Sequence, residues 1–429
     1  MKPILQVALD FVDLERAINL AREAVAGGAD WIEAGTPLIK SEGLNAVRAL
    51  RREFPKAVIV ADMKTMDAGR AEIEIASKAG ADIAVALAAA SDSTIRECVE
   101  AGKSYGIKVA ADLLGVADPV ARARELDALG VSHIGYHTPI DEQMMGETPF
   151  ASLRALAEAV DCPVAVAGGV NSETAALAIQ AGASIVIVGG AINKAPDARA
   201  ATEAIKRAMA EGVQVHTDRY VRARGEELRD HLTKLTTADI STGNQDWPAI
   251  GGFTQVCPGT KLVGPAFTVR TLAGDWSKPV QAIDQADAGD VIVIDAGGEP
   301  PAVWGEMASM SARNRGIAGV VIRGGIRDTA DIRKMGLPAY ATVVCPHAGK
   351  PKGYGEMNVP VSLGGQTVNP GDWIVGDDDG LIVLPKARAV EFANRGMDKL
   401  EGEERIIREI EAGKSLGQVV ELARWDIAH

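Results

Sequence analysis

At about 150 residues per domain, a chain of 429 residues holds two or three domains, and two suffice if one is a barrel of about 200 to 250 residues. Hydrophobic residues make up 47% of the chain and charged residues 24%, which excludes a mainly disordered protein. The net charge of -13 excludes an extended basic surface, so we expect no direct nucleic acid binding.

The cysteines are few and widely separated. The chain has no CxxC pair, which favours reduced thiols in a cytoplasmic protein over a disulfide framework or a thiolate zinc site. No run reaches 18 apolar residues, so we expect no membrane association. The four positions are Cys98, Cys162, Cys257 and Cys345.

A repeat runs through the first half of the chain. Gly28, Gly80, Gly130 and Gly182 each end an Ala-rich helical pattern and precede a short apolar run, with spacings of 52, 50 and 52 residues. Each glycine stands where a helix needs a left-handed residue after its last turn. The period is long enough for two strand-helix units.

Eight short apolar runs alternate with helical patterns such as 14–26 and 92–105. Eight alternating strand-helix units predict a (β/α)8 TIM barrel over residues 1–212, with its active site at the carboxyl ends of the strands. An open, doubly wound sheet is the alternative fold. The predicted strands are 4–9, 31–34, 58–61, 83–87, 108–111, 133–136, 164–167 and 185–188.

Charged residues follow most of these strands. A charge at the end of a buried strand faces the mouth of the barrel and is a functional candidate. Strands 7 and 8 end instead in Gly168-Gly169 and Gly189-Gly190, at loops that commonly bind phosphate in such barrels. The charged candidates are Asp10, Glu33, Asp62, Lys64, Asp112 and His137.

One strand end carries the pattern D-x-K-x-x-D, Asp62 to Asp67. With this pattern, residues 1 to about 210 resemble the orotidine 5′-phosphate decarboxylase suprafamily, and within it the 3-hexulose-6-phosphate synthases. The other segments that carry the resemblance are Leu5 to Asp10, Ile32 to Pro37, and His137 to Gln143.

The 3-keto-L-gulonate 6-phosphate decarboxylases resemble the chain at the same strands. They would place an arginine shortly after the histidine, where this chain has Asp141-Glu142-Gln143. The synthase interpretation is therefore preferred. The alternative is such a decarboxylase joined to a protein-binding regulator of RNA degradation.

The resemblance implies an aldol reaction of formaldehyde with ribulose 5-phosphate, or its reverse, through an enediolate. Glu33 and Asp62 would hold Mg²⁺ or Mn²⁺, because such cations take oxygen ligands. His137 would move the C1 proton and Lys64 would stabilise the oxyanion. The remaining roles are orientation by Asp10 and Asp112, phosphate binding by the backbone of Gly169, Gly189, Gly190 and Ala191, and a reach by Asp67 into the neighbouring site of a barrel homodimer.

Structural roles are the alternatives for several of these residues. His137 could be a core histidine, and Asp10 could cap the helix that begins at Leu14. Lys64 and Asp62 could merely pair with each other.

The repeat stops at Gly212. We interpret residues 213–225 as a linker and 226–429 as a second α/β domain. From about Glu226 to Leu422 the chain resembles the regulator of ribonuclease E activity A and the 4-hydroxy-4-methyl-2-oxoglutarate aldolases. The carrying segments are Thr237 to Ser241, Gly305 to Met307, Gly324 to Asp328, Val368 to Asp372, and Asp377 to Gly380.

This second resemblance implies a fold of the ribonuclease E regulator type and leaves the activity open. As an aldolase or decarboxylase of 2-oxo acids, the domain would use Asp328 for a divalent metal, Arg327 for the substrate carboxylate, and the helix start at Gly305 and Glu306 for the same anion. Alternatively, Arg327 and Asp328 form a structural pair that caps the helix at Thr329. A regulatory or oligomerising domain, commonly a trimer in that family, is the third possibility.

The acidic run Asp377 to Asp379 looks like a set of oxygen ligands. We interpret it instead as a hairpin turn completed by Gly380.

Overall fold

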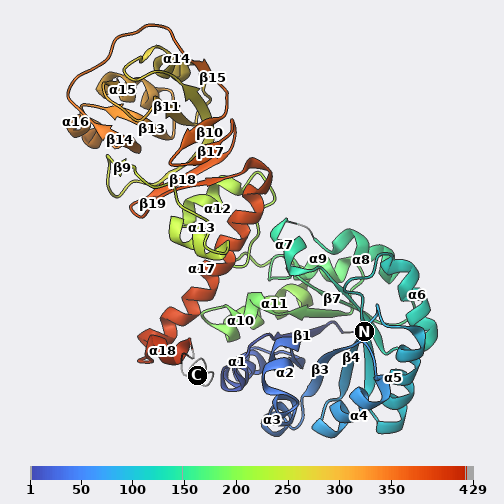
Figure 1. The fold of residues 1–429 in the computed structure, drawn as a ribbon. Helices are drawn as coiled ribbons and strands as arrows, with labels where there is room; N and C mark the ends of the chain where they lie inside the picture. The colour runs from blue at the N-terminus through green and yellow to red at the C-terminus, as the bar shows by residue number, and fades with distance from the viewer. Residues whose placement is uncertain (1, 147, 421, 423–429) are drawn as a thin grey trace. The chain divides into compact units, whose positions relative to one another are not determined.

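The computed structural model describes residues 2–146, 148–420 and 422. Eight parallel strands form a closed barrel in the first half, with β1 hydrogen-bonded to β8, so the alternative of an open sheet is wrong. Figure 1 shows helices around the ring of strands. The strands are β1 (Ile4–Leu9), β2 (Trp31–Ala34), β3 (Val58–Thr65), β4 (Ile83–Leu87), β5 (Lys108–Asp112), β6 (His133–His137), β7 (Val164–Ala167) and β8 (Ile185–Val188).

The helices begin and end at local signals in the sequence. Asp13 and Ser91 accept hydrogen bonds from first-turn backbone amides, and Gly80 and Gly130 end their helices in the left-handed conformation. The helices are α1 (Leu14–Ala26), α2 (Thr36–Glu42), α3 (Asn45–Glu53), α4 (Gly69–Ala79), α5 (Asp92–Tyr105), α6 (Pro119–Leu129), α7 (Ile140–Met144), α8 (Phe150–Ala157), α9 (Ala175–Gln180), α10 (Gly190–Asn193) and α11 (Ala198–Glu211).

Strand β3 departs most from the expected pattern. It continues to Thr65, and its pairing with β4 shifts register between Ala61 and Thr65. Lys64 lies in this irregular stretch with a φ of 46°, a backbone conformation that non-glycine residues rarely adopt. Irregular strand ends of this kind redirect side chains, and here the irregularity falls on the D-x-K-x-x-D pattern.

Small aliphatic residues fill the barrel core. Helix α1 buries Ala17, Leu20, Ala21 and Ala24, which are spaced as one face of a helix. This packing agrees with the low aromatic content of the chain, 4%.

The second half contains a mixed sheet whose main path is β19-β18-β10-β11-β13-β14-β9, and β10, β11, β13 and β14 pair in parallel. The predicted turn at Asp378-Asp379 is confirmed, because Asp377 pairs with Gly380 across the hairpin. The strands are β9 (Thr254–Gln255), β10 (Leu262–Arg270), β11 (Val291–Asp295), β12 (Ala302–Trp304), β13 (Gly319–Ile326), β14 (Ala339–Val344), β15 (Glu356–Met357), β16 (Val361–Leu363), β17 (Gln366–Val368), β18 (Trp373–Asp377) and β19 (Gly380–Leu384).

The chain divides into two compact units. Among the described residues, the first comprises 2–143, 148–222, 401–420 and 422, and the second comprises 144–146 and 223–400. Residues 401–411 group with the barrel in this division, and the predicted second domain spans 226–429. The helices of the second half are α12 (Leu228–Lys234), α13 (Thr237–Gly243), α14 (Ser277–Gln285), α15 (Glu306–Asn314), α16 (Thr329–Met335), α17 (Ala389–Glu411) and α18 (Leu416–Val419).

Within the described residues, every helix is too short or too polar to cross a membrane. All four cysteines are free, and Cys98 is buried in the barrel core. The cytoplasmic location stays a prediction.

Candidate active site

A cavity of about 790 Å³ opens among the carboxyl ends of the barrel strands. It brings together residues from seven of the eight strand ends, as the barrel fold predicts. The predicted residues that line it are Asp10, Glu33, Asp62, Lys64, Asp112, His137, Gly169, Gly189 and Gly190.

Lys64 is the centre of the charged network in this cavity. Its ammonium lies 2.8 Å from Asp112 Oδ2 and 3.0 Å from Asp62 Oδ2. Burial alone would lower the pKa of Lys64, but the two carboxylates outweigh it and raise the pKa. The alternative that Lys64 merely pairs with Asp62 does not describe all of its contacts, because the Lys64 cation also binds Asp112 and so bridges two strand ends.

His137 faces the same network from the end of β6. Its Nδ1 lies 3.5 Å from Asp112 Oδ2, and its side chain is 30% exposed. Burial raises the pKa of Asp112, but the contact with His137 and the charge of Lys64 reverse this and bring it to about 2. The Asp112 carboxylate is thus ionised and contacts both groups that the resemblance assigns to the chemistry.

The alternative that His137 is a core histidine is wrong, because its ring lines the cavity. The buried histidine of this strand is His133, whose pKa burial lowers to about 4, with a smaller contribution from Lys108.

Glu33 is buried on the opposite side of the cavity. Gln6 Nε2 donates a hydrogen bond of 2.5 Å to Glu33 Oε2. Burial, followed by the charges of Asp62 and Asp10, raises the pKa of Glu33 well above its ordinary value. The negative charges of Asp62 and Asp10 therefore act on Glu33, and the positive charge of Lys64 offsets them only in part.

Asp10 is open to the solvent of the cavity, yet it lies deep enough among protein atoms that burial, and then Asp62, raises its pKa. A Cβ on Gly35 would lie 2.3 Å from Asp10 Oδ1, and one on Gly189 would lie 2.9 Å from Oδ2, so two glycines make room for this carboxylate. The alternative that Asp10 caps helix α1 is wrong, because Asp13 does so.

These carboxylates fit a hard dication. Such cations take oxygen ligands, and the buried Oε1 of Gln6 is a further oxygen without a hydrogen-bond partner among the described residues. Within the part of the chain that the structure describes, no three His, Cys, Asp or Glu side chains are grouped as a complete metal site. Glu33 and Asp62 could therefore supply only part of a coordination shell, as in sites that a substrate completes.

Two predicted residues lie outside the cavity lining, Asp67 and Ala191. Asp67 is exposed and its carboxylate accepts a hydrogen bond from the amide of Ala68. Its predicted reach into a neighbouring subunit stays a prediction.

Sequence reasoning missed several residues that shape the cavity. Thr36 Oγ1 donates to Asp62 Oδ2 at 2.7 Å, and Gln143 Nε2 donates to the carbonyl of Thr138 at 2.7 Å. Asn193 donates to the carbonyl of Ala8 at 2.8 Å. Only Gln6 carried a usable signal, as a lone polar residue inside an apolar strand.

In the second unit, Arg327 and Asp328 form an ion pair, as the alternative of a structural pair predicted. Arg327 Nε lies 3.1 Å from both carboxylate oxygens of Asp328. The expected cap on the helix at Thr329 is wrong, because Asp328 makes no side-chain capping bond there. Asp328 instead accepts a hydrogen bond of 3.2 Å from the amide of Glu306, at the start of α15, where a Cβ on Gly305 would come within 2.6 Å of it.

In comparisons with known proteins, the two halves of the chain match different families. The family model described as orotidine 5′-phosphate decarboxylase / HUMPS family matches residues 3–205, and the RraA-like model, described as Aldolase/RraA, matches residues 237–383.

Curated relatives match the first half over nearly their whole length. The 3-hexulose-6-phosphate synthase of Mycobacterium gastri is 42% identical over 206 residues, covering 48% of this chain and 99% of that protein. The synthase of Bacillus subtilis is 41% identical over 209 residues, with coverage of 48% and 99%.

Among solved structures, the RNA-processing inhibitor RraA from Thermus thermophilis is 29% identical and covers 35% of this chain and 93% of that one, with a TM-score of 0.33. This chain belongs to the orotidine 5′-phosphate decarboxylase / HUMPS family through its N-terminal barrel and joins that barrel to an RraA-like domain.

Proposed function

We propose that the barrel catalyses the aldol condensation of formaldehyde with D-ribulose 5-phosphate to D-arabino-hex-3-ulose 6-phosphate, or the reverse, through an enediolate. The observation that carries this proposal is the Asp112 carboxylate, which contacts Lys64 and His137 inside a barrel about 40% identical to curated 3-hexulose-6-phosphate synthases. A base and a fixed cation side by side are what proton removal next to a carbonyl needs.

The sugar phosphate would enter with its phosphate toward the glycine loops. Gly169, Gly189 and Gly190 line the cavity, and Gly168 and Gly169 have φ values of 96° and 68° that expose backbone without a side chain. In this proposal, amides of Gly169, Gly189, Gly190 and Ala191 bind the phosphate. The reacting carbons then lie toward β3, β5 and β6.

His137 takes the proton from C1 in the condensation direction. Histidine ordinarily exchanges protons near neutral pH, and Asp112 orients the ring. The electrons of the broken C1–H bond form the enediolate, whose negative oxygen lies against the ammonium of Lys64. C1 then bonds to the formaldehyde carbon, and the formaldehyde oxygen receives the proton from His137.

Glu33 and Asp62 would hold Mg²⁺ or Mn²⁺ beside the substrate oxygens. A dication there supplies charge stabilisation to a developing oxyanion. The raised pKa of Glu33 supports this role, because Lys64 offsets only part of the effect of burial and of the neighbouring negative charges on this carboxyl group. Thr36 keeps Asp62 oriented through its hydrogen bond to Oδ2.

The test is consumption of ribulose 5-phosphate by the full chain with and without formaldehyde, run in both directions. We expect consumption only with formaldehyde, and formaldehyde release from the hexulose phosphate. The proposal fails if the barrel ignores formaldehyde and instead releases CO₂ from 3-keto-L-gulonate 6-phosphate.

For the second domain we propose a 2-oxo-acid aldolase or decarboxylase that uses Arg327 and Asp328. Their joint placement beside Gly305 at the start of α15 supports this, because the Arg327 cation, the Asp328 carboxylate and the Glu306 amide lie together. The full chain would be incubated with Mg²⁺ and oxaloacetate or a 4-hydroxy-2-oxo acid. If no pyruvate forms, the regulatory alternative is favoured.

The barrels are proposed to form homodimers in which Asp67 reaches the partner's site. The exposure of Asp67 supports this. Light scattering of the full chain and of Asp67→Ala gives the oligomeric state of each protein. A full chain that is monomeric and active would contradict the proposed homodimer.

A further inference from the structure

One wall of the candidate active site comes from outside the eight strand-helix units. Tyr220, Gly402, Arg405 and Ile406 line the cavity together with the barrel residues. The family model match ends at residue 205, so these residues lie beyond the part of the chain that the model matches.

Residues 215–222, here called the strap, run along the loop that follows β7. The amide of Val215 donates to the carbonyl of Ser172 at 3.1 Å, and Ser172 Oγ donates back to Val215 at 2.7 Å. Asn171 Nδ2 donates to the carbonyl of Tyr220 at 3.1 Å. The strap is thus attached beside the glycine pair that ends β7.

From this attachment, Tyr220 reaches the loop that follows β8. A Cβ built on Gly190 would lie 2.3 Å from Tyr220 Cε2 and 2.5 Å from both Cζ and Oη. Only glycine therefore fits at position 190 while the phenol is in place. The hydroxyl end of Tyr220 lies directly over backbone proposed to bind phosphate.

The C-terminal half of helix α17 holds Tyr220 in this position. Glu401 accepts hydrogen bonds from the amide of Tyr220 and, at 2.8 Å, from Arg222, and the side chains of Glu401 and Arg222 are only 7% and 9% exposed. The guanidinium of Arg222 also lies 4.3 Å from the centre of the Tyr220 ring. Tyr220 has a φ of 55°, an unfavourable conformation for a non-glycine residue that these contacts maintain.

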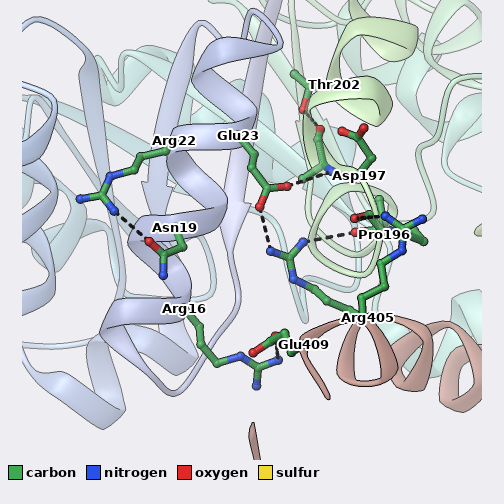
Figure 2. Close-up of polar contacts among 12 residues, drawn as sticks. Arg16, Asn19, Arg22, Glu23, Pro196, Asp197, Thr202, Arg405 and Glu409 are labelled. Atoms are coloured by element: carbon green, nitrogen blue, oxygen red, sulfur yellow. Dashed lines mark hydrogen bonds and ion pairs between the residues drawn. The ribbon is translucent and has the colours of Figure 1, made fainter. Parts of the chain in front are cut away.

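The helix end is itself fixed to the barrel. Arg405 contacts Glu23 at 3.1 Å and the carbonyl of Ala195 at 3.2 Å, and Arg16 contacts Glu409 at 3.0 Å (Figure 2). Tyr220 is therefore positioned before any substrate arrives, which avoids an ordering cost on binding.

We propose that Tyr220 is a substrate-binding residue of the barrel, and that its hydroxyl donates a hydrogen bond to the phosphate of a sugar phosphate lying at Gly190. Glu401 and Arg222 are positioning residues for it. The ligand class is a phosphomonoester, which the lysines that also line this cavity, Lys40 and Lys194, suit by charge. This inference rests on the proposed function for the identity of the sugar phosphate.

Tyr220→Phe in the full chain removes only the hydroxyl. Because hydrogen bonds to charged groups are stronger than neutral ones, we expect KM for ribulose 5-phosphate and the inhibition constant of inorganic phosphate to rise about tenfold. The kcat and the KM for formaldehyde should stay within about twofold, because the phosphate is remote from the reacting carbons. Glu401→Gln should raise the same KM by a smaller factor.

Tyr105→Phe is the matched control, since the Tyr105 hydroxyl contacts Glu74 and does not line the cavity. Unchanged constants in Tyr220→Phe would overturn the proposal. A fall in KM in Tyr220→Phe or Tyr220→Ala would overturn it as well, by showing that Tyr220 obstructs the site.

Calorimetric titration with inorganic phosphate separates this inference from the proposed reaction. If the wild type shows no formaldehyde-dependent turnover but binds phosphate more tightly than Tyr220→Phe, the reaction is wrong and the Tyr220 site holds. Equal phosphate affinities, or no binding to the wild type, would overturn the site.

Discussion

The ammonium of Lys64, at the end of β3, lies 2.8 Å from the carboxylate of Asp112, at the end of β5. The irregular end of β3 and the positive φ of Lys64 accompany this placement. Backbone strain at a charged strand end is typical of a functional site, where surrounding contacts maintain it. Asp112 therefore links the cation and the proposed base into one unit.

Asp112→Asn should uncouple that unit. The neutral amide attracts Lys64 less and no longer stabilises a protonated His137, so we expect kcat of the proposed condensation to fall about 100-fold or more. The KM for ribulose 5-phosphate should change little. Steady-state kinetics with both substrates varied checks this, and a selective rise in KM would instead show that Asp112 binds substrate.

The same substitution should change the acid stability of the barrel. The pKa of Asp112 is about 2 in the folded protein, below the ordinary value of about 3.9 in an unfolded chain. Its contribution to the free energy of unfolding, roughly 2 kcal/mol, is therefore present above about pH 4 and lost as the pH falls toward 2. Chemical denaturation from pH 6 to 2.5 should show a smaller loss in Asp112→Asn, whereas equal losses would contradict the shift.

The barrel could be predicted because its signals are local. Glycines such as Gly80 and Gly130 end helices in the left-handed conformation, and each predicted strand begins at the residue where the structure begins it. The charged strand ends converge because parallel strands of a closed barrel share one mouth. The barrel fold and the approximate position of the candidate active site could therefore be predicted from the repeat of about 51 residues.

Contacts between distant segments could not be predicted in this way. The burial of Glu401 against Arg222 joins residues 179 positions apart, and no local pattern marks either. The residues before Gly225 look like a polar linker in composition, yet the structure attaches them to the loop after β7. Such packing depends on tertiary context, which composition does not record.

His137→Ala tests the proposed proton transfer. Loss of a positioned base costs about 100- to 10,000-fold, so formaldehyde-dependent turnover should fall within that range. Exchange of the C1 proton of ribulose 5-phosphate with deuterated water, followed by NMR without formaldehyde, should slow in parallel. His347→Ala, an exposed histidine of the second unit, is the control. Undiminished exchange in His137→Ala would assign the base to another residue.

Glu33→Gln tests the metal proposal without relying on activity. The pKa of Glu33 is raised well above that of an unfolded chain, so its contribution to stability is present at low pH and is lost as the pH rises through the folded value. At pH 7 without metal, where Glu33 of the unfolded chain is ionised, this group therefore destabilises the barrel, and Glu33→Gln should raise the Tm of the barrel transition.

Added Mg²⁺ should reverse the order of the two Tm values, so that the wild type becomes more stable than Glu33→Gln. At about 100 times its Kd, a ligand that binds only the folded state stabilises it by about 2.7 kcal/mol, which should raise the Tm of the wild type by several degrees. Glu33→Gln should lose most of this rise, while Glu53→Gln, whose carboxylate pairs with Arg22 at the surface, should keep it. Scanning calorimetry of the three proteins with and without Mg²⁺ measures this. An equal Mg²⁺-dependent rise in Tm in all three would show that the cation binds away from Glu33, because metal affinity depends on the ionisation of a residue only where that residue is a ligand of the cation.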